Sequence, residues 1–574
     1  MNPAQLLAHF DRISEAPDAI PRLRRFILDL AVRGKLVQQD PKDEPASELL
    51  KRIQAEKARL MKAGEIRKEK PLPMFEPDEA PFRKPDRWEW VRIRQVTSDR
   101  GQTTPEKDFT YIDVTAINKE VGCVADPKVL SASDAPSRAR KVVQAGDVLY
   151  SCVRPYLLNI AVVDKDIVPS PIASTAFVVL NGFGLVLSKY LWIALRSPFM
   201  VECVEGKMRG QAYPAINDSD FALLPFPLSP LAEQHRIVAK VDELMTLCDR
   251  LESAQAERES RRDRLAAASL DRLNNASDAD NFRDHAGFHL RHLSRFTARP
   301  EQIPALRQTI LNLAVRGKLV QQDPSDEPAA ELLNRIQGEK ARLIKDGALR
   351  KEQSLAPVAE EESPFSIPSS WRWARIGTCS LLTEYGTSVK SDHADNGVPV
   401  LKMGDIQGGQ LSLGGQKKVP RLIDDLPQLF LKRFDLLYNR TNSAELVGKT
   451  GIYLGEDDAY TFASYLIRIR FINELSNPVY ANFSMNSPFF RETQIMPEIQ
   501  QQCGQANVNG TKLRNMVIPL PPLAEQHRIV AKVDELMTLC GRLAAQLTSA
   551  QTESRRLLET VLHEALAPML EHSK

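Results

Sequence analysis

Few residues of this chain combine the types and spacing that catalytic chemistry requires. Gly448 to Thr450 matches the end of a phosphate-binding loop, but the glycine that this motif needs five positions earlier is Ser443. His285, His289 and His292 have near-helical spacing, yet no carboxylate or cysteine arrangement accompanies them as a metal site would require. Neither a glycine-rich dinucleotide loop nor the Asn-Pro-Pro-aromatic motif of amino-methyltransferases is found. The sequence therefore offers no convincing active site, which argues against an enzyme.

Polar side chains in glycine-containing loops suit a different chemistry, the binding of nucleic acid. Arginine pairs with guanine, and asparagine or glutamine with adenine, and each good bidentate pair discriminates by about 1–3 kcal/mol. Lysine and threonine would hold phosphates. Any one of these residues is more often an ordinary surface residue, so the set carries more weight than its members. The candidate DNA-binding residues are Thr103, Thr104, Arg154, Tyr156, Lys207, Arg209, Gln211, Thr387, Ser388, Lys390, Lys402, Arg440, Asn442, Ser443, Gln505, Asn507 and Asn509.

Short β-like runs, broken by Gly, Pro, Asn and Asp, surround these loops and indicate two compact modules. We expect each module to be an α/β domain with a small, mostly antiparallel sheet. Helical stretches are expected around Ser188–Arg196 and Pro488–Gln502. The expected strands are Tyr111–Val114, Asp147–Val153, Ala176–Leu180, Val398–Leu401, Asp435–Tyr438 and Leu466–Arg470.

Two internal repeats flank the modules. Residues 30–60 align with residues 313–343 with four mismatches in 31 positions, an offset of 283 that extends to Trp88 and Trp371. Leu231–Cys248 is identical to Leu523–Cys540, at an offset of 292. Between these repeated frames, residues 98–222 and 381–514 show no comparable match. A plain duplication would leave the middles related too, so the frames serve one shared purpose and the middles two separate ones.

The frames are predicted to be helical. In the helix predicted to begin near Leu231, apolar residues recur at Ile237, Val241, Leu244, Cys248 and Leu251, with spacing four, three, four, three. A second helix should follow each Asp-Glu-Pro at 43–45 and 326–328. We expect these two helices to pair antiparallel as a two-helix coiled coil in each frame. An ordinary helical hairpin is the alternative.

The predicted fold class is thus α/β (α+β). Two recognition modules with small sheets are joined by two antiparallel coiled-coil regions, in a circular arrangement with pseudo-twofold symmetry that the end of the chain completes. The second module is about nine residues longer than the first. The predicted boundaries are 1–80 for an N-terminal helical region, 81–228 for the first module, 229–363 for a central coiled coil, 364–521 for the second module and 522–574 for a C-terminal helix.

Composition sets broad limits on function. The 574 residues have a net charge of only +2, so any DNA contact must come from local patches. The seven cysteines include no CxxC pair, which argues against a disulfide framework or a structural zinc site and favours a reducing compartment. We find no signal peptide and no apolar run of about 18 residues, and so expect a cytoplasmic chain without a membrane segment.

The alternation of frame and module resembles the specificity subunit of type I restriction–modification systems over essentially the whole chain. The N-terminal frame of about 80 residues most resembles the type IB subgroup. The motifs that carry the resemblance are Ile518–Val530 (IPLPPLAEQHRIV), its twin Pro225–Val238, Gly146–Val163 and the paired LAVRGKLVQQDP that begins at Leu30 and Leu313. The resemblance implies a non-catalytic subunit in which each module is a target recognition domain for one half of a split, asymmetric DNA sequence.

The family also implies partners and cofactors. Double-stranded DNA, two adenine methyltransferase subunits and two motor-nuclease subunits would bind this chain, which itself would hold no cofactor or metal. S-adenosylmethionine, ATP and Mg²⁺ would belong to the partners. The alternative function is a coiled-coil scaffold or a DNA-binding protein outside restriction. Candidate docking residues lie in the repeated basic turn and at the start of the repeated helix: Arg33, Lys35, Arg316, Lys318, Glu233, Gln234, Glu525 and Gln526.

Overall fold

The computed structural model describes residues 16–66, 71–73, 75–211, 213–276, 278–392, 396–502 and 505–566. The chain divides into two compact units, and each consists of one module with its supporting helices. Unit 1 comprises residues 1–258 and 551–574, and unit 2 comprises residues 259–550. Because residues 551–566 belong to the same unit as residues 16–258, the chain returns to its first unit, as predicted for a circular arrangement.

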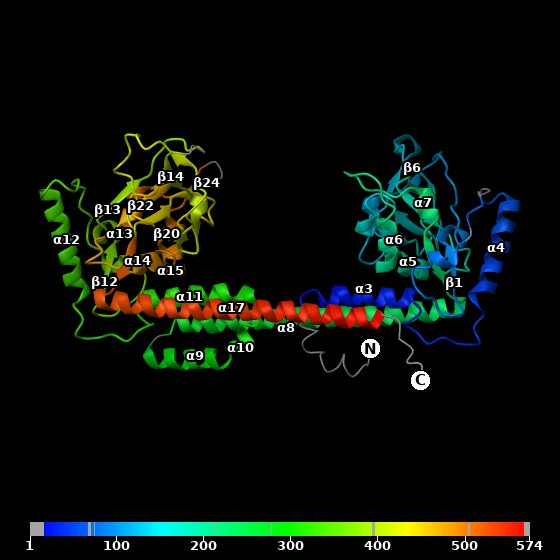
Figure 1. Ribbon diagram of the computed structural model, residues 1–574, viewed down its shortest axis with the longest axis horizontal. Coiled ribbons are helices and arrows are strands. Elements are labelled where there is room, and N and C mark those ends of the chain that lie inside the picture. Colours follow the sequence, from blue (N-terminus) through cyan, green and yellow to red (C-terminus); the bar gives the residue numbers. More distant parts are fainter. Residues whose placement is uncertain are drawn as a thin grey trace. The chain divides into compact units, whose positions relative to one another are not determined.

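The frame of unit 1 is built from α3 (Ala19–Val32), the first part of α8 (Leu231–Asn274) and the last part of α17 (Leu523–Leu566) (Figure 1). The predicted apolar seam of α8 is confirmed, because Ile237, Val241 and Cys248 are buried in one core with residues of α3. On the other side of α3, Ala19 packs with Leu558 of α17. The helix α3 therefore contacts both long helices.

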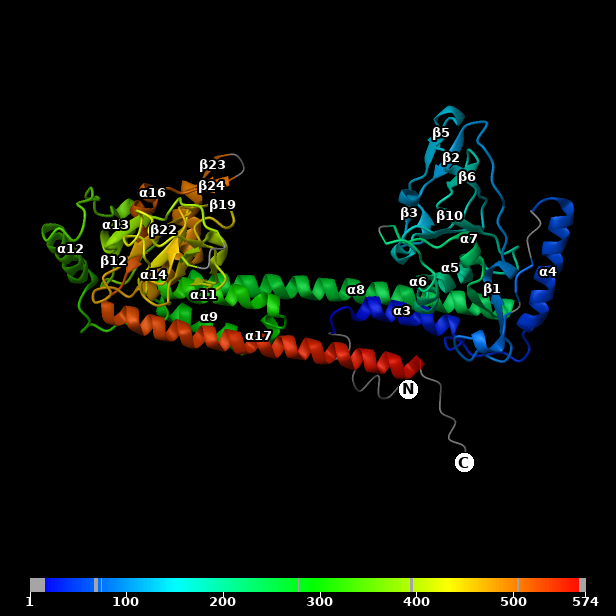
Figure 2. The ribbon, with the colours of Figure 1, turned by 45° about the horizontal axis from the view of Figure 1, so that its top comes forward.

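The predicted coiled-coil pairing of helix α4 (Ala46–Ala63) with α8 is wrong. The helix begins after Pro45, as expected, but it runs at a steep angle to α8 in both views (Figures 1 and 2). Its buried face holds Leu49 and Ile53 and continues to Lys57, whose ammonium donates hydrogen bonds of 2.6 and 3.0 Å to the carbonyls of Arg94 and Thr97. This face packs against the first residues of the module, around Arg94 and Thr97. The helix that pairs along α8 is therefore α3 and not α4.

Between its first and last strands, the described part of the first module contains two small sheets of mixed, mostly antiparallel strands, as predicted. Among its described strands, the β4–β8 and β2–β9 pairs are the parallel ones. Helices α5 (Ser188–Arg196), α6 (Pro198–Glu205) and α7 (Asp218–Ala222) complete the module. One sheet has the order β10 (Phe177–Leu180), β7 (Val148–Ser151), β8 (Ile160–Val162), β4 (Cys123–Val124) and β3 (Ile117–Asn118); the other has β5 (Lys128–Leu130), β2 (Phe109–Ile112), β9 (Pro171–Ser174) and β6 (Ala139–Val142).

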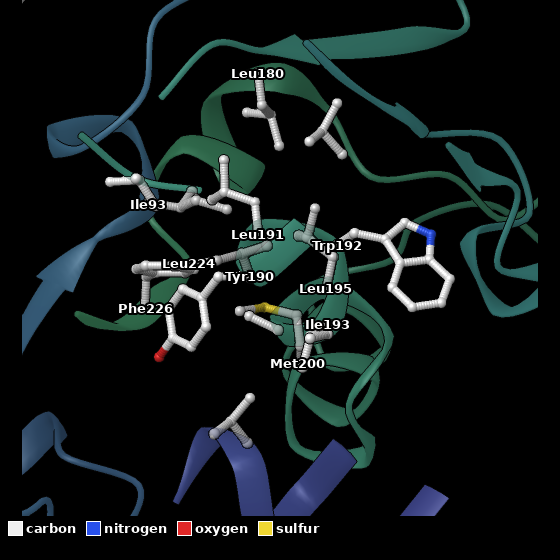
Figure 3. Close-up of a cluster of buried hydrophobic side chains, with 14 of the residues drawn as sticks. Ile93, Leu180, Tyr190, Leu191, Trp192, Ile193, Leu195, Met200, Leu224 and Phe226 are labelled. Carbon is white, nitrogen blue, oxygen red and sulfur yellow. The ribbon is translucent and has the colours of Figure 1, made fainter. Parts of the chain in front are cut away.

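The core of this module centres on α5. Its Tyr190, Leu191 and Ile193 are fully buried, and Figure 3 shows them among side chains such as Phe226 and Met200. The Tyr190 hydroxyl donates a 2.7 Å hydrogen bond to the carbonyl of Pro227, which satisfies the one polar atom of this ring in the core. The same core includes buried residues of α3 and α8, so the module packs directly on these two helices of the frame.

Unit 2 repeats this frame with different segments of the chain. Helix α11 (Ile303–Val315) packs along the first part of α17, and the last part of α8 belongs to the same unit. Helix α12 (Ala329–Lys345) takes the place of α4, and its Lys340 donates to the carbonyls of Gly377 and Ser380. Two further helices, α9 (Ala279–Arg291) and α10 (Leu293–Phe296), precede α11; His289 on α9 is buried and hydrogen-bonded to Ser269 of α8.

The second module is also mixed, with antiparallel pairs in the majority. Its helices are α13 (Ile376–Cys379), α14 (Pro478–Met485), α15 (Pro488–Phe490) and α16 (Gly510–Asn515), and a π-helical turn covers Arg491–Ile495. Its largest sheet has the order β13 (Leu382–Tyr385), β22 (Leu466–Arg470), β18 (Leu436–Asn439), β20 (Thr450–Ile452), β16 (Gln410–Leu411) and β15 (Ile406–Gln407). A second sheet has the order β17 (Lys418–Val419), β14 (Val398–Leu401) and β21 (Thr461–Phe462). A third has the order β19 (Thr441–Asn442), β24 (Gln505–Asn507) and β23 (Gln500–Gln502).

Each module is closed by its own first and last strands. In unit 1, β1 (Glu89–Arg92) pairs antiparallel with β11 (Pro225–Leu228), and in unit 2, β12 (Arg372–Arg375) pairs in the same way with β25 (Val517–Leu520). The repeat with offset 283 contributes the first strand and the repeat with offset 292 contributes the second. These two-stranded sheets are therefore where the two repeats of the frame meet, and the unequal offsets reflect only the longer second module.

Candidate nucleic-acid interface

Two of the predicted loops of the first module lie side by side. After β7 the chain turns at Arg154, which has a φ of +49°, and enters a short 3-10 turn at Pro155–Leu157. The Arg154 amide donates to the carbonyl of Pro214 at 2.8 Å, and Ala215 forms isolated bridges with Val153 and Arg209. The structure thus brings together the predicted residues Arg154, Tyr156, Lys207, Arg209 and Gln211, and all five are exposed.

A third loop, which carries the exposed residues Thr103 and Thr104, is tied to the same region by Lys141. The Lys141 side chain is only 4% exposed, and its ammonium lies 2.9 Å from Asp99 and 3.3 Å from Asp218. Burial acts to lower the pKa of this lysine, but the two carboxylates outweigh it and the pKa is raised. Since Asp99 precedes the Thr103 loop and Asp218 follows the 207–217 loop, the charged lysine links the two loops.

The predicted residues of the second module also converge. Strand β19 pairs Thr441 with Asn507 of β24. The Arg440 guanidinium lies 5.0 Å from the ring centroid of Tyr385 and donates a 2.9 Å hydrogen bond to the carbonyl of Ser464. A longer contact of 3.5 Å joins Arg440 to the side-chain oxygen of Asn507. Arg440 and Asn507 therefore belong to one polar surface, together with the half-buried Asn442 and the exposed Ser443.

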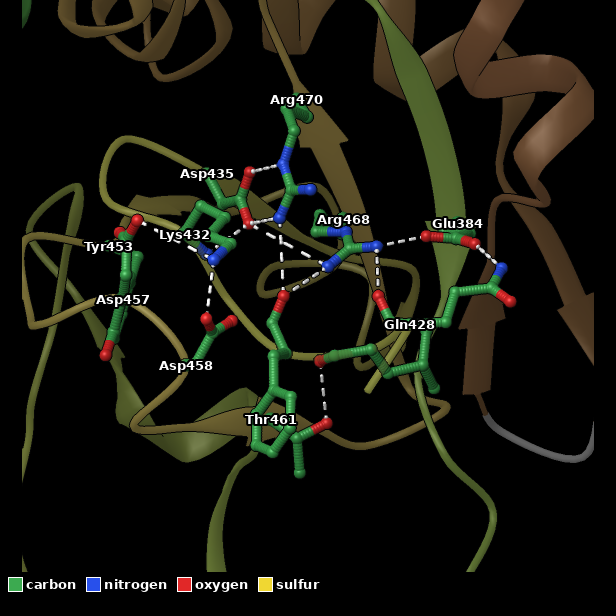
Figure 4. Close-up of polar contacts among 12 residues, drawn as sticks. Glu384, Gln428, Lys432, Asp435, Tyr453, Asp457, Asp458, Thr461, Arg468 and Arg470 are labelled. Atoms are coloured by element: carbon green, nitrogen blue, oxygen red, sulfur yellow. Dashed lines mark hydrogen bonds and ion pairs between the residues drawn. The ribbon is translucent and has the colours of Figure 1, made fainter. Parts of the chain in front are cut away.

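Buried carboxylates hold the strands that lead to both arginines. Asp147, at the start of β7, accepts hydrogen bonds from Arg100 and Asn181, and is fully buried. Asp435, at the start of β18, accepts two hydrogen bonds from Arg470, at 2.5 and 2.6 Å (Figure 4). A buried charge is stable only when it is paired and hydrogen-bonded, which both carboxylates are. Each network fixes the base of the strand that ends near Arg154 or Arg440.

Some predicted contacts are directed into the protein instead. Thr387 is 3% exposed and its hydroxyl donates to Asp425 at 2.5 Å, so this residue supports the fold and is not available to a ligand. Asn509 is exposed, but its side-chain oxygen accepts from the Lys512 amide at 2.9 Å and caps α16. Sequence patterns did not separate such capping residues from contact residues. Of the other predicted residues, Ser388 and Lys390 are exposed, Lys402 is half-buried, and the side chain of Gln505 lies outside the described part of the chain.

The predicted docking residues at the start of α8 and α17 are also internal. Glu233 accepts hydrogen bonds from the Trp88 indole at 2.9 Å and from Gln39 at 2.5 Å, and it is fully buried. Gln234, also fully buried, accepts from the Leu187 amide. The equivalent residues of unit 2, Glu525 and Gln526, are each 1% exposed and repeat these bonds to Trp371, Gln322 and the Asn477 amide. These four residues join helix to module and do not face a partner.

The repeated basic turns cap the far ends of the long helices. Lys35 donates a 2.7 Å hydrogen bond to the carbonyl of Leu566, the last residue of α17, and Lys318 donates a 2.7 Å bond to the carbonyl of Ala276 just beyond α8. A cation at this place is favoured by the negative end of the helix dipole. The arginines of the same turns stack on aromatic rings: Arg33 lies 4.5 Å from the ring centroid of Phe82, and Arg316 lies 4.4 Å from that of Phe365. Their predicted contact with a partner stays a prediction.

Two exposed tyrosines at the interface were missed by the sequence reasoning. Tyr213 is 69% exposed and lies 4.9 Å beneath the Arg154 guanidinium, and Tyr385 is 45% exposed beneath Arg440. The signal that could have found them is an aromatic residue close to glycine in a polar loop. Gly210 precedes Tyr213 by three residues, and Gly386 follows Tyr385 directly.

Comparison with known proteins identifies the family. The family model described as the type I restriction modification DNA specificity domain matches residues 379–549. The specificity subunit of the type I restriction enzyme EcoEI of Escherichia coli is 30% identical over 558 residues, with 95% of this chain and 94% of that protein covered. The EcoAI specificity subunit, also from Escherichia coli, is 31% identical over 565 residues, with the same coverage. The chain belongs to the family of type I restriction enzyme specificity subunits. A specificity subunit recognises DNA within such a system and is not itself a catalyst. The predicted role in DNA recognition and the prediction that the chain is not an enzyme are both confirmed.

The fold agrees with this assignment. A chain from a solved structure that concerns complex assembly and conformational transition of the type I R-M system has a TM-score of 0.50 and 24% sequence identity. It covers 85% of this specificity subunit and is itself covered completely. The α/β arrangement with two modules is thereby confirmed. No helix in the described ranges has the length and apolar character needed to cross a lipid bilayer.

Proposed function

We propose that this specificity subunit reads a bipartite, asymmetric DNA sequence, with one half-site for each module. The observation that carries the proposal is the contrast between the two parts of each unit. The frames are nearly identical in sequence, whereas the loops at the free ends of β7 and β18 have unrelated sequences. Two modules of one family with different contact loops are suited to two different DNA half-sites.

We further propose that the frames dock two adenine methyltransferase subunits, which bring S-adenosylmethionine, and that two ATP-dependent motor-nuclease subunits, which bring ATP and Mg²⁺, join the complex for restriction. Leu231–Cys248 and Leu523–Cys540 are identical at exposed positions as well as buried ones. Packing explains the identity of buried residues, but it places no such demand on solvent-facing ones. The exposed face shared by both copies, which we call the repeated face, consists of His235, Ala239, Asp242, Glu243, Thr246 and Leu247 on α8 and of His527, Ala531, Asp534, Glu535, Thr538 and Leu539 on α17.

Two features support a protein partner on the repeated face. Leu247 and Leu539 are 49% and 47% exposed, and an exposed leucine kept in both copies suits the apolar centre of an interface. The net charge of +2 also supports a complex, because a protein that grips DNA alone usually relies on an excess of basic residues. Partner subunits would then supply part of the attraction for phosphates.

A module exchange tests the reading of two half-sites. Residues 93–224 would be replaced by the corresponding segment of a relative with another DNA target, which leaves the β1–β11 pair intact. The subunit would be co-expressed with its methyltransferase, and methylated adenines would be mapped by sequencing. We expect one half of the methylated sequence to change and the other half and the spacer to stay. A change in both halves, or no methylated sequence in the unaltered complex, would contradict the proposal.

The docking surface is tested with charge substitutions. Leu247→Glu and Leu539→Glu should each remove one methyltransferase copy from the complex, as measured by native mass spectrometry. Leu265→Glu is the matched control, because this leucine is 60% exposed on α8 but lies outside the repeated segment. Retention of both copies in either of the first two variants would show that the methyltransferases bind elsewhere.

A further inference from the structure

Each module contains one arginine that lies over an exposed tyrosine at the free end of a central strand. In the first module the strand is β7, the arginine is Arg154 and the ring is Tyr213, at 4.9 Å. In the second module the strand is β18, the arginine is Arg440 and the ring is Tyr385, at 5.0 Å. Tyr213 lies in a loop after its arginine in the sequence, whereas Tyr385 ends strand β13 before its arginine, so the same arrangement is built from unrelated segments.

The backbone around Arg154 is held in place although the side chain is exposed. A residue with a side chain rarely adopts a φ near +49°, and such strain persists only where surrounding contacts fix it. Here the Arg154 amide donates a hydrogen bond to the carbonyl of Pro214. The next residues form the 3-10 turn Pro155–Leu157, which is followed by Leu158 with a φ of +55°. Strained residues of this kind are concentrated at ligand-binding sites.

The guanidinium of Arg154 keeps its hydrogen-bond donors for a ligand. A ring beneath a guanidinium attracts its charge and fixes its plane, but it uses none of the N–H groups in that plane. Among the described residues, no hydrogen bond is donated by the Arg154 guanidinium. The nearby Arg209 differs, because its guanidinium is paired with Asp220 at 3.0 Å.

Arg440 is more firmly held but also keeps donors. Its Nε donates to Ser464 at 2.9 Å, and one contact of its Nη1 reaches Asn507 at 3.5 Å, beyond the usual length of a strong hydrogen bond. Its Nη2 makes no hydrogen bond within the described part of the chain. Tyr385 is fixed from below, since its hydroxyl accepts a 2.6 Å hydrogen bond from the Gly510 amide. The ring and the arginine are therefore both preorganised.

We propose that Arg154 and Arg440 each read one guanine in the major groove, and that Tyr213 and Tyr385 are the positioning residues that hold the two guanidinium planes. A planar fork with free N–H donors matches the N7 and O6 acceptors of guanine, and lysine cannot reproduce this bidentate geometry. Each half of the DNA target would then contain a G·C pair whose recognition depends on one of these pairs. This inference rests on the proposed reading of two half-sites.

The test uses the full complex of the specificity subunit with its methyltransferase, and the readout is the sequence around methylated adenines. Arg154→Lys should lose discrimination at one G·C position of one half-site by about ten- to a hundredfold. The other half-site should stay unchanged. Arg440→Lys should have the same effect in the other half. Tyr213→Ala should weaken discrimination at the position that Arg154→Lys affects, whereas Arg138→Ala, an exposed arginine of the same module, should leave the methylated sequence unaltered.

The outcomes separate this inference from the proposed function. Two results would overturn the guanine-reading inference alone. In the first, module exchange changes one half-site, but the half-sites contain no G·C pair. In the second, Arg154→Lys and Arg440→Lys leave the methylated sequence unchanged. A native complex without any specific methylated sequence would overturn the proposed function. Thermal unfolding of each variant shows whether it is folded, and a lysine variant that fails to fold is replaced by glutamine at the same position, for which the same loss is expected.

Discussion

Replacing Glu525 with alanine removes the acceptor at the centre of the junction between α17 and the second module. Glu525 is 1% exposed and accepts hydrogen bonds from the Trp371 indole at 2.8 Å and from Gln322 at 2.6 Å. Without the carboxylate, two buried donors have no partner, and each costs about 1–3 kcal/mol. Burial of the carboxylate is itself unfavourable, since it raises the pKa of Glu525 above its usual value, and its removal offsets part of this loss. We expect unit 2 to lose about 3 kcal/mol of stability in total.

Glutamine at Glu525, and at the equivalent Glu233 of unit 1, distinguishes the loss of a hydrogen bond from the loss of packing. The amide of Glu525→Gln offers only one oxygen, so one donor of Trp371 or Gln322 faces an NH₂ group. In unit 2, Gln322 resists reorientation because its own oxygen accepts from Ser370 at 3.1 Å. Among the described residues of unit 1, Gln39 makes one further contact besides its bond to Glu233, at 3.5 Å to Gly34, so it can turn and present its oxygen. Glu525→Gln should therefore destabilise its unit more than Glu233→Gln destabilises unit 1.

The assay is thermal unfolding of the purified chain, followed by calorimetry and by tryptophan fluorescence, because Trp88 and Trp371 are buried in the two junctions. A loss of about 3 kcal/mol corresponds to a fall of about 5 °C in the midpoint of the affected transition, given the size of unit 2. Glu535→Ala is the control, since this exposed glutamate has only a surface ion pair with Lys532, which is worth little. Equal midpoints for Glu525→Ala and Glu535→Ala, or equal costs for the two glutamine variants, would refute this reasoning.

Three further predictions concern stability. Burial raises the pKa of Glu233 in the folded state. The stability that this residue contributes is therefore greatest below its pKa in the unfolded chain, and it declines as the pH rises through its pKa in the folded protein. Glu233→Gln should flatten this decline in a series of melting curves between about pH 4 and 8. Lys35→Met and Lys318→Met should cost about 0.3–1 kcal/mol and speed hydrogen exchange in the last turns of α17 and α8, respectively, whereas unchanged exchange would exclude capping. Gly122 has a φ of +77°, and a Cβ there would lie 2.2 Å from the Trp192 indole, so Gly122→Ala should lower the melting temperature of unit 1 by several degrees.

Much of the module structure could be predicted because strands reveal themselves locally. The six expected strands all overlap observed ones, although Tyr111–Val114 shares only its first two residues with β2. The helix Ser188–Arg196 was predicted with the bounds that α5 has. The segment Pro488–Gln502 was only partly right, since it forms the short α15, a π-helical turn, a 3-10 turn and then β23. The preceding helix α14 was missed, because nearly every side chain on it is buried and polar residues such as Asn482 and Ser484 interrupt the apolar pattern.

The frame was harder to predict, since partner choice among helices is a tertiary property. The apolar positions of α4 are compatible with a coiled coil, but Lys57 reaches the carbonyls of Arg94 and Thr97 and directs this helix to the module. Likewise, a repeated Glu-Gln at a helix start looks the same in sequence whether it faces solvent or an indole. Contact loops were found from composition, yet only the structure shows that Thr387 is turned inward and that Tyr213 lies beneath Arg154.

The division of the units along the chain has a consequence for the order of folding. Unit 2 is one continuous segment, residues 259–550, and all of it has been synthesised before the last part of α17 appears. Unit 1 begins at the N-terminus but needs residues 551–566, because Ala19 packs with Leu558 and Arg22 pairs with Glu559 at 2.7 Å. The half of the protein that is made first is thus completed last, and α3 keeps an uncovered apolar side throughout translation of the second half. A stop codon near position 550 would spare the whole of unit 2 and leave unit 1 unfinished.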